Sequence, residues 1–550
     1  MKNLYFFFIL LFCLNGFGQN LYLKLVGKNN LDTKTIDSIG YNIKHSNAKS
    51  VIDETNFFSK KLLNAGYIEN EIVKNLKPND STFTYEYNLG KRTKFIHIYI
   101  DKEFQEFNDE KLDTISMPIT DSELFLNSIL KKLESRGFSL AKVKLDNIKN
   151  KSNFIIANLK IDLGKKRQVN DVVINGYDKF PEGHKNAIRR LYKNKVFNQQ
   201  NLEQLYKDFE RFRFVKQTKY PEILFTKDST RVYVYLEKTK SNNFDGFLGF
   251  NNDEAKKIVF TGYLDLTLNN ILNSGEKLSL YWKSNGKDQK TFNLGVEIPY
   301  IFKSPFGIKA QLNIFKQDST FQTTQTAINL GYLFNYNSRL YLGYQSAESS
   351  DIKNLNTATL SDFTNSFVTT NYEFVQYKND DFLFPEKTNL NLKIGTGKRN
   401  SNFQSNNQIF GNLNLKYNFY LNPKNIINIK SQNFYLQSDE YIINELQRFG
   451  GINSIRGFNE NSLQGNAFSS ILTEYRYVLS PSIYVHSIID YGYFQDKTNN
   501  LKDNLLGLGF GFGLLTKNGL LNLVYANGST KNQTIKLSNS IVHISLKATF

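Results

Sequence analysis

A two-residue alternation of apolar and polar side chains runs through the C-terminal half of the chain and limits its fold more than any other feature. It is clearest at the end, where Val542, Ile544, Leu546, Ala548 and Phe550 fall on one face of an extended segment. Successive side chains of a β-strand point to opposite faces of the sheet. A strand with its apolar face outward and its polar face inward is typical of a membrane barrel.

The alternation recurs in sixteen segments, separated by clusters of Asn, Gly, Ser and Asp. They lie at about 244–252, 256–270, 276–286, 290–300, 306–317, 320–335, 338–349, 363–379, 387–399, 407–421, 425–439, 467–480, 482–496, 504–516, 519–528 and 540–550. An even strand number suits a bacterial barrel, and closure satisfies backbone groups that lipid cannot. A soluble β-sandwich is the alternative, but it needs neither outward Tyr and Phe on so many strands nor an export signal. The sequence therefore predicts a sixteen-stranded antiparallel transmembrane barrel over residues 243–550.

One predicted barrel strand carries a row of glycines. Gly507, Gly509, Gly511 and Gly513 alternate with apolar residues and would all face the lumen. Glycine weakens a strand because it has no side chain to pack. The row therefore predicts that another piece of backbone lies close against this part of the wall.

The stretch Arg448–Asn466 interrupts the alternation between two predicted strands. It reads RFGGINSIRGFNENSLQGN, is dominated by Gly, Asn and Ser, and shows no strand-like pattern. Loops of this length are usually either functional or disordered. An ordinary solvent-exposed loop is one interpretation. An arginine and a phenylalanine flanked by glycines favour a folded loop that reaches into another part of the molecule.

The N-terminus has the pattern of a secretory signal peptide over residues 1–18. Lys2 supplies the positive charge, Leu4–Leu14 the apolar region, and Gly16 and Gly18 the small residues before a cleavage site at Gln19. The single cysteine, Cys13, lies within this segment, so the mature chain forms no disulfide. The net charge of +18 comes from dispersed lysines. For an exported chain this favours contact with anionic lipid and not with nucleic acid.

Residues 19–242 carry a mixed pattern that recurs three times, at 19–93, 94–164 and 165–242. Such a regular period indicates an array of modules, and each module is predicted to be β-α-α-β-β with an exposed sheet edge. The predicted helices span Ala48–Asn64, Asp121–Arg136 and Asn201–Phe212, with Asp121 as an N-cap. Three small spacer domains that bind nothing are the alternative.

The array resembles POTRA domains, the periplasmic modules that precede barrels of the BamA/TamA family. The resemblance is carried by Gly90, Gly164, Gly66-Tyr67, Gly137-Phe138 and the run Val172–Gly176. In that family POTRA domains bind unfolded clients or partners, partly by addition of a strand to an exposed edge, as a free sheet edge allows.

The loop resembles the sixth outer loop of the same family. Ile455, Arg456, Gly457 and Phe458 match its motif of Ile or Val, Arg, Gly, then Phe or Tyr. In the family this loop folds back inside the barrel, here over residues 440–466. The resemblance also implies that Phe550 is the terminal aromatic residue of an outer-membrane sorting signal.

Two carboxylates on the next strands share an inward parity with the lumen. Glu474 and Asp490 can accept the forked guanidinium of Arg456, a geometry that arginine serves better than lysine. Gly457 allows a tight turn, and Phe458 can pack against the glycine-lined wall. Ordinary lumen polarity is the alternative for the two acids.

Enzyme chemistry is not predicted. The five histidines lack metal-ligand spacing, and Gly395–Lys398 resembles a phosphate loop only weakly because Leu392 stands where the first glycine belongs. We therefore predict no catalytic, metal or cofactor site, and no cofactor.

These features together predict a non-enzymatic outer-membrane protein assembly or translocation factor, closest in layout to TamA, with its POTRA domains in the periplasm. The expected partners are outer-membrane lipid and lipopolysaccharide, unfolded outer-membrane or secreted clients, and an inner-membrane-anchored periplasmic protein. The alternative is a POTRA-containing secretion or solute pore in which the 440–466 loop is a plug. Secretion pores of this superfamily usually carry two POTRA domains and an N-terminal plug helix. A purely structural porin would leave the array unexplained.

Overall fold

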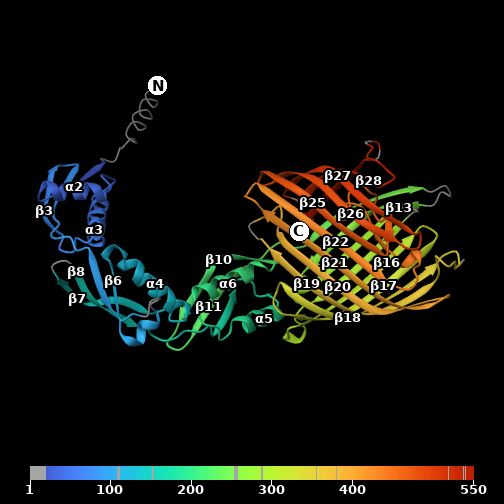
Figure 1. Ribbon diagram of the computed structural model, residues 1–550, viewed down its shortest axis with the longest axis horizontal. Helices are drawn as coiled ribbons and strands as arrows, with labels where there is room; N and C mark the ends of the chain where they lie inside the picture. Colours follow the sequence, from blue (N-terminus) through green and yellow to red (C-terminus); the bar gives the residue numbers. More distant parts are fainter. Residues whose placement is uncertain are drawn as a thin grey trace, which may run out of the picture. The chain divides into compact units, whose positions relative to one another are not determined.

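The computed structural model describes residues 20–107, 112–151, 154–252, 258–285, 289–354, 356–378, 381–517, 519–536, 538 and 540–550. The chain divides into two compact units, one formed by residues 1–168 and 196–201, the other by 169–195 and 202–550. The first unit holds two small sheets, and the second holds a third small sheet and a barrel (Figure 1). No described helix is long and apolar enough to cross a membrane. The predicted signal peptide lies outside the described residues.

The first module is a four-stranded sheet covered by two helices. Its elements are β1 (Leu21–Gly27), α2 (Asn30–Ile39), β2 (Lys44–His45), α3 (Ala48–Asn64), β3 (Glu71–Asn79) and β4 (Thr82–Asn88), with strand order β2-β1-β4-β3. The α3 helix begins where the side chain of Asn47 accepts a hydrogen bond from the Ser50 amide. Its Phe58 and Leu62 pack against Leu23 in the core. The β3 strand forms an open edge whose side chains are all exposed.

The second module departs from the predicted β-α-α-β-β pattern. Its elements are β5 (Phe95–Tyr99), the 3₁₀ helix η1 (Lys102–Phe107), β6 (Thr114–Pro118), the 3₁₀ helix η2 (Ile119–Asp121), α4 (Ser122–Ser135), β7 (Lys142–Lys151) and β8 (Phe154–Asp162). Among its described residues there is one α-helix. The position of the other is taken by η1, whose Phe104 and Phe107 enter the core, and by the edge strand β6.

The predicted N-cap of α4 is wrong. The backbone of Asp121 is helical, with φ −95° and ψ −8°, and its side chain makes no capping bond. An N-cap residue needs an extended backbone for its side chain to reach back to the first turn. Because η2 runs directly into α4, Asp121 lacks that geometry.

The third module completes the array and confirms three small α/β sheets before the barrel. Its elements are β9 (Asp171–Asn175), α5 (Glu182–Tyr192), α6 (Gln199–Glu210), β10 (Val215–Phe225) and β11 (Thr230–Lys238), with strand order β10-β11-β9. Both helices expected in this module are present, but the sequence located only the second, because α5 is mostly polar and buries only His184, Ala187, Ile188 and Tyr192.

The prediction of a closed antiparallel barrel of sixteen strands is confirmed. The strands are β12 (Asn243–Asn252), β13 (Ile258–Asn269), β14 (Lys277–Asn285), β15 (Gln289–Ile298), β16 (Phe306–Gln317), β17 (Phe321–Leu333), β18 (Ser338–Asp351), β19 (Phe363–Tyr377), β20 (Glu386–Ser401), β21 (Ser405–Tyr420), β22 (Asn425–Gln437), β25 (Ala467–Ser480), β26 (Ile483–Asp496), β27 (Leu501–Thr516), β28 (Gly519–Ser529) and β29 (Ile541–Thr549). Its outer surface is apolar: Val368, Phe510 and Ile544 are each 64% exposed there. Removing these side chains from water requires lipid, as in other membrane barrels.

The loop between β22 and β25 contains structure that the sequence did not predict. It holds the short 3₁₀ helix η4 (Ile443–Glu445), and β23 (Gln447–Phe449) pairs antiparallel with β24 (Leu463–Gly465). The prediction that Arg448–Asn466 contains no strand is therefore wrong at both of its ends. These three-residue strands have no alternation of their own, and their pairing forms only because the loop folds back on itself.

Candidate functional site: a loop anchored inside the barrel

The structure brings the loop arginine and the two predicted carboxylates together in the lumen. The Arg456 side chain donates from Nε to Asp490 Oδ2 at 2.8 Å and from Nη2 to Asp490 Oδ1 at 2.5 Å. Its Nη1 donates to Glu474. The Arg456 backbone amide also donates to Asp490, at 3.0 Å. Arg456 is 5% exposed and Asp490 is fully buried, so this pair is a fork of charge-assisted bonds shielded from water.

Sequence reasoning missed a second arginine in this cluster. Arg476 donates to Glu474 Oε2 at 2.7 Å from Nε and at 2.6 Å from Nη2, and to Asn418 at 3.1 Å. The His486 ring lies 3.9 Å from the same carboxylate. Glu474 thus receives two guanidinium groups. Arg476 is two residues from Glu474 on the same strand, so its shared inward parity was the available signal.

The neighbours of the arginine fix the loop by close packing. Ile455 is fully buried in a cluster with Phe449, Phe468, Leu472, Phe494 and Leu505. Gly492 lies beneath Ile455, where a Cβ atom would clash with its side chain. The loop can approach the wall this closely only because the wall residue beneath Ile455 is a glycine without a side chain.

Gly457 has a positive φ of 86° and lies against the β28 backbone. A Cβ atom there would clash with Asn527 and Gly528. The Phe458 ring packs over Gly528, where an added Cβ would lie 2.8 Å from Phe458 Cε2. The wall glycine that receives Phe458 is therefore on β28 and not in the predicted row on β27.

The four glycines of that row serve different neighbours. Gly507 faces the Arg456 carbonyl and so contacts the loop backbone. Gly511 and Gly513 make room for the rings of His486 and Tyr484 on β26, and Gly509 faces the β28 backbone. The row clears space for the loop at Gly507, and mainly for lumen side chains elsewhere.

The tip of the loop reaches strands far from its anchor. Glu460 accepts a hydrogen bond from the Tyr281 hydroxyl at 3.1 Å and forms an ion pair with Lys283, both on β14. On β15, Gln289 donates to the Asn461 carbonyl at 3.4 Å. The loop thus crosses the lumen, from β25 and β26 at Arg456 to β14 and β15 at its tip. Sequence reasoning did not single out Glu460.

The stem of the loop has its own buried ion pair. Arg399 of β20 contacts Glu445 at 2.5 Å, and these side chains are only 1% and 2% exposed. Asn444 donates to the Ser349 hydroxyl at 2.8 Å and to the Ser361 carbonyl at 2.9 Å. These contacts hold the stem to the wall formed by β18 to β20.

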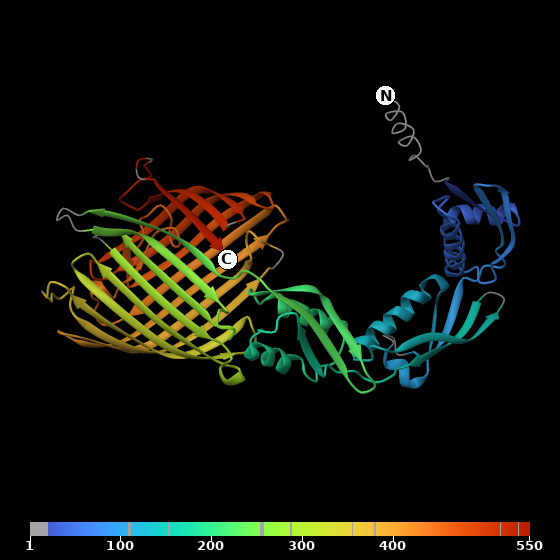
Figure 2. The same cartoon turned by 180° about the vertical axis from the view of Figure 1, so that it is seen from behind.

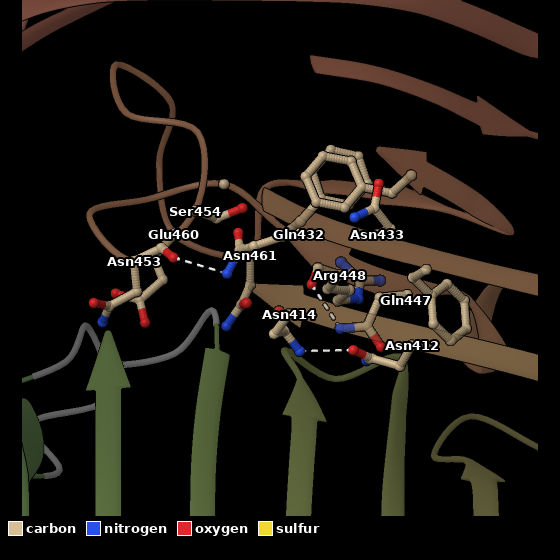
Figure 3. Close-up of a pocket in the computed structure, with 14 residues that line it drawn as sticks. Asn412, Asn414, Gln432, Asn433, Gln447, Arg448, Asn453, Ser454, Glu460 and Asn461 are labelled. Carbon is tan, nitrogen blue, oxygen red and sulfur yellow. Dashed lines mark hydrogen bonds between the residues drawn. The ribbon is translucent and has the colours of Figure 1, made fainter. Parts of the chain in front are cut away.

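A polar cavity of about 190 Å³ lies beside the loop (Figure 3). Asn412, Asn414 and Gln432 line it from the wall, while Arg448 and Asn461 line it from the loop. No group of three or more metal-ligating side chains occurs in the part of the chain that the structure describes. The charged groups of the site bind one another, so the arrangement holds a loop in position.

The first and last barrel strands meet at a short seam (Figure 2). In the described ranges, β12 pairs with β29 only at Asn243–Thr549 and Phe244–Ala548. By contrast, β12 pairs with β13 from Asn243 through Asn252. Most of the β12 edge that faces β29 therefore lacks ladder hydrogen bonds.

The predicted sorting residue lies at this seam. Phe550 donates its backbone amide to the Asn242 carbonyl at 2.9 Å and accepts from the Asn242 amide at 3.1 Å. Its ring is exposed on the outer face. The C-terminal residue thus closes the barrel at its periplasmic end.

Comparison with known proteins rests on solved structures. No protein-family model matches this chain, and no curated protein matches it. CdiB from Acinetobacter baumannii matches with a TM-score of 0.52 and 14% identity, over 83% of this chain and 90% of that chain. CdiB from Escherichia coli matches with a TM-score of 0.51 and 12% identity, over 90% and 97%. BamA from Haemophilus ducreyi lacking POTRA domains 1-3 gives a TM-score of 0.49 and 16% identity, over 82% and 99%.

At these identities the comparisons show a shared fold. The fold is three small POTRA-like α/β modules followed by a sixteen-stranded barrel, as the sequence resemblance to the BamA/TamA family implied. TamA itself is not singled out. A closed antiparallel barrel with an apolar outer surface belongs in the bacterial outer membrane, so the POTRA modules lie in the periplasm.

Proposed function

We propose that this protein is a non-enzymatic assembly, insertion or translocation factor for outer-membrane or secreted clients. The observation that carries the proposal is the seam, where the described residues of β12 and β29 pair only at Asn243–Thr549 and Phe244–Ala548. An unpaired strand edge is a template for another extended chain. In lipid, unpaired backbone groups are costly, so an incoming client strand is the natural partner for this edge.

Clients are first received in the periplasm by the POTRA modules. The open edge strand β3 exposes its side chains along its whole length, from Glu71 to Asn79. Addition of an extended client segment to such an edge uses backbone hydrogen bonds and demands little of the client's sequence. An inner-membrane-anchored periplasmic partner would use the same kind of surface.

The anchored loop supports the proposal by keeping the wall fixed while the seam opens. Arg456 joins the loop to β25 and β26 through Glu474 and Asp490. Gly457 and Phe458 pack on β28, and Glu460 binds β14, so the loop contacts strands on both sides of the seam. The wall on either side of β12 and β29 can then act as a rigid frame. Outer-membrane lipid and lipopolysaccharide surround the barrel on its apolar face.

A reversible lock of the seam tests the proposal. Residues directly opposite in an antiparallel pair lie close enough for a disulfide, so Asn243→Cys with Thr549→Cys should join β12 to β29 at their register pair. The mature chain has no cysteine to interfere. We expect client assembly in proteoliposomes to stop when the pair is oxidised and to resume after reduction.

The matched control places the bond one strand away. Leu523 of β28 and Ile544 of β29 are also direct partners, and a cysteine pair there joins strands that are already fully paired. It should leave client assembly unchanged. Equal assembly with the seam locked and open would refute the lateral route.

A second test concerns the POTRA array. Deleting residues 20–240 should leave a barrel that inserts but no longer assists clients. Unchanged client assembly would argue against a receptor role for the array.

The second candidate function is a secretion or solute pore in which the 440–466 loop is a plug. The observation that favours it is the loop itself, which crosses the lumen and is held at Glu445, Arg456 and Glu460. Depletion of the protein separates the two candidates. Loss of many barrel proteins from the outer membrane supports assembly, and loss of one secreted substrate supports a pore.

A further inference from the structure

The periplasmic turn between β15 and β16 is strained. Tyr300, Phe302 and Lys303 have φ values of 52°, 51° and 58°, in the left-handed region that non-glycine residues rarely adopt. Such conformations persist only where the surroundings hold them. The turn therefore needs a partner that fixes it.

The third POTRA module is that partner. Arg190 of α5 donates from Nη1 to the Lys303 carbonyl at 2.8 Å. The His184 ring packs edge-on against the Tyr300 ring at 5.0 Å, and Gly183 lies so close that a Cβ atom would meet the Tyr300 Cβ at 2.8 Å. The α5 helix thus holds the turn from one side and leaves its tip free.

The tip presents an aromatic ring with no protein around it. Phe302 is 96% exposed. The outer face of the barrel carries an aromatic row close to this turn in the chain, where the Phe306 and Tyr332 rings lie 5.6 Å apart and the Tyr332 and Phe334 rings 5.1 Å apart. Phe302 precedes Phe306 by four residues, so the exposed tip leads directly into a strand of the lipid-facing surface.

The neighbouring periplasmic turn, between β13 and β14, repeats the arrangement. Tyr177 of the third module bonds to Asn270 at 3.1 Å and to Asn273 at 3.2 Å. The tip of this turn exposes Leu272, which is 72% exposed. Two turns that hold the same POTRA module thus each present an apolar side chain.

We propose that the β15–β16 turn is a membrane anchor for the third POTRA module. Phe302 inserts among the lipids of the periplasmic leaflet, and Lys303 and Arg190 face the lipid phosphate groups. Aromatic side chains favour the membrane interface because one part of their surroundings is apolar and the other wet. Cations beside them are attracted by anionic headgroups. This proposal goes beyond the proposed function, because the turn would bind the membrane in the same way in an assembly factor and in a pore.

Depth-dependent fluorescence quenching tests the anchor. The chain has one tryptophan, Trp282, so Trp282→Phe removes the background and Phe302→Trp places a single reporter at the tip. The full mature chain is folded into phosphatidylglycerol-containing vesicles with brominated acyl chains. We expect at least a twofold loss of reporter fluorescence compared with unbrominated vesicles.

The matched control is Ile148→Trp in the same background, because Ile148 is also well exposed but lies in the second module. Its fluorescence should be unchanged by bromination. Equal quenching of the two variants would overturn the anchor.

A second measurement tests the role of the cations. Adding Arg190→Ala to the Phe302→Trp variant should reduce quenching about twofold, because the turn loses its support and a charge. Replacing phosphatidylglycerol by phosphatidylcholine should reduce quenching of the Phe302→Trp variant. The reduction should be smaller when Arg190→Ala is also present. Quenching that ignores both Arg190 and the lipid charge would overturn the headgroup contact, and the gel mobility of the unheated barrel shows that each variant is folded.

Discussion

The wall formed by β25 and β26 and the seam between β12 and β29 are built from the same kind of alternating strand, yet they are held very differently. The wall is paired along most of its length and carries the buried fork between Arg456 and Asp490. Among the residues that the structure describes, the seam is paired only at its periplasmic end. Stability in a protein is unevenly distributed, and elements that move come from its weak regions. The barrel has a rigid frame on one side and an edge that can open on another.

The largest effect is expected from removing the Arg456 side chain, which ties the loop to β25 and β26. Loss of one partner of a buried ion pair typically costs roughly 3–5 kcal/mol, because the survivor is left unpaired, and water in the lumen should reduce this to about half or less. Arg456→Ala should therefore leave a folded barrel with a misplaced loop, greater protease cleavage of the loop, and slower client assembly. Arg456→Lys should rescue poorly, since an ammonium group cannot fork across two carboxylates.

Arg448→Ala is the control within the same loop, because Arg448 lies over the Phe315 and Phe321 rings. Such contacts are worth about 0.5–1 kcal/mol when exposed and about 2 kcal/mol when desolvated. Arg448 is half-buried, so its effect should be smaller than that of Arg456. A normal rate of client assembly in the Arg456→Ala protein would show that the Arg456 ion pair is dispensable.

A smaller effect is expected from adding a side chain to the wall glycine that contacts the Arg456 backbone. Gly507→Ala places a methyl group against the Arg456 carbonyl, and overpacking of this kind typically costs about 1–3 kcal/mol. Gly411→Ala is the matched change, because the space around Gly411 is open. Urea unfolding in detergent micelles should separate the two variants, and equal midpoints would contradict the close approach of the loop.

The contacts of α5 with the turn between β15 and β16 should weaken in acid. Burial, together with the nearby Arg339, lowers the pKa of His184 to about 3, against an opposing effect of Glu297. The unfolded chain binds a proton near pH 6.5 and the folded chain does not, so this stability is complete above pH 6.5 and is lost as the pH falls toward 3. The slope is at most about 1.4 kcal/mol per pH unit.

Hydrogen exchange of the α5 amides at pH 7.5 and pH 5 measures this loss. His184→Phe keeps an aromatic ring among Phe212, Phe214 and Tyr300 and should remove the pH dependence. The comparison uses protection factors, which correct for the faster intrinsic exchange at higher pH. If the protection factors of both proteins are the same at the two pH values, His184 does not contribute in this way.

The smallest effect on stability should come from the seam itself. Deleting Phe550 removes two backbone bonds to Asn242, each worth about 0.5–1.5 kcal/mol. We expect the unfolding midpoint to move little. Insertion of this protein into the outer membrane should slow, because Phe550 is predicted to be part of a sorting signal. If the variant that lacks Phe550 reaches the outer membrane in normal amounts, Phe550 is not part of a sorting signal.

Most of the barrel could be predicted from the sequence because strand periodicity is a local property. The C-terminal alternation from Val542 to Phe550 matches β29, and the other fifteen strands lie within a few residues of their predicted segments. The parity of Glu474 and Asp490 followed from the same two-residue rule. In the POTRA modules, local pattern also located α3, α4 and α6 to within about two residues. It failed at two points: Asp121 does not cap α4, and η1 stands where the second module was expected to have another helix.

The sequence by itself determined which residues face the membrane, which face the lumen, and that the chain closes into sixteen strands. Only the tertiary structure decided that Arg476 shares Glu474, that Glu460 reaches β14, and that β23 pairs with β24. The physical reason is the distance along the chain between the residues that interact. Alternation is set by neighbours along the chain, whereas these contacts join residues that come together only after the barrel has closed around the loop.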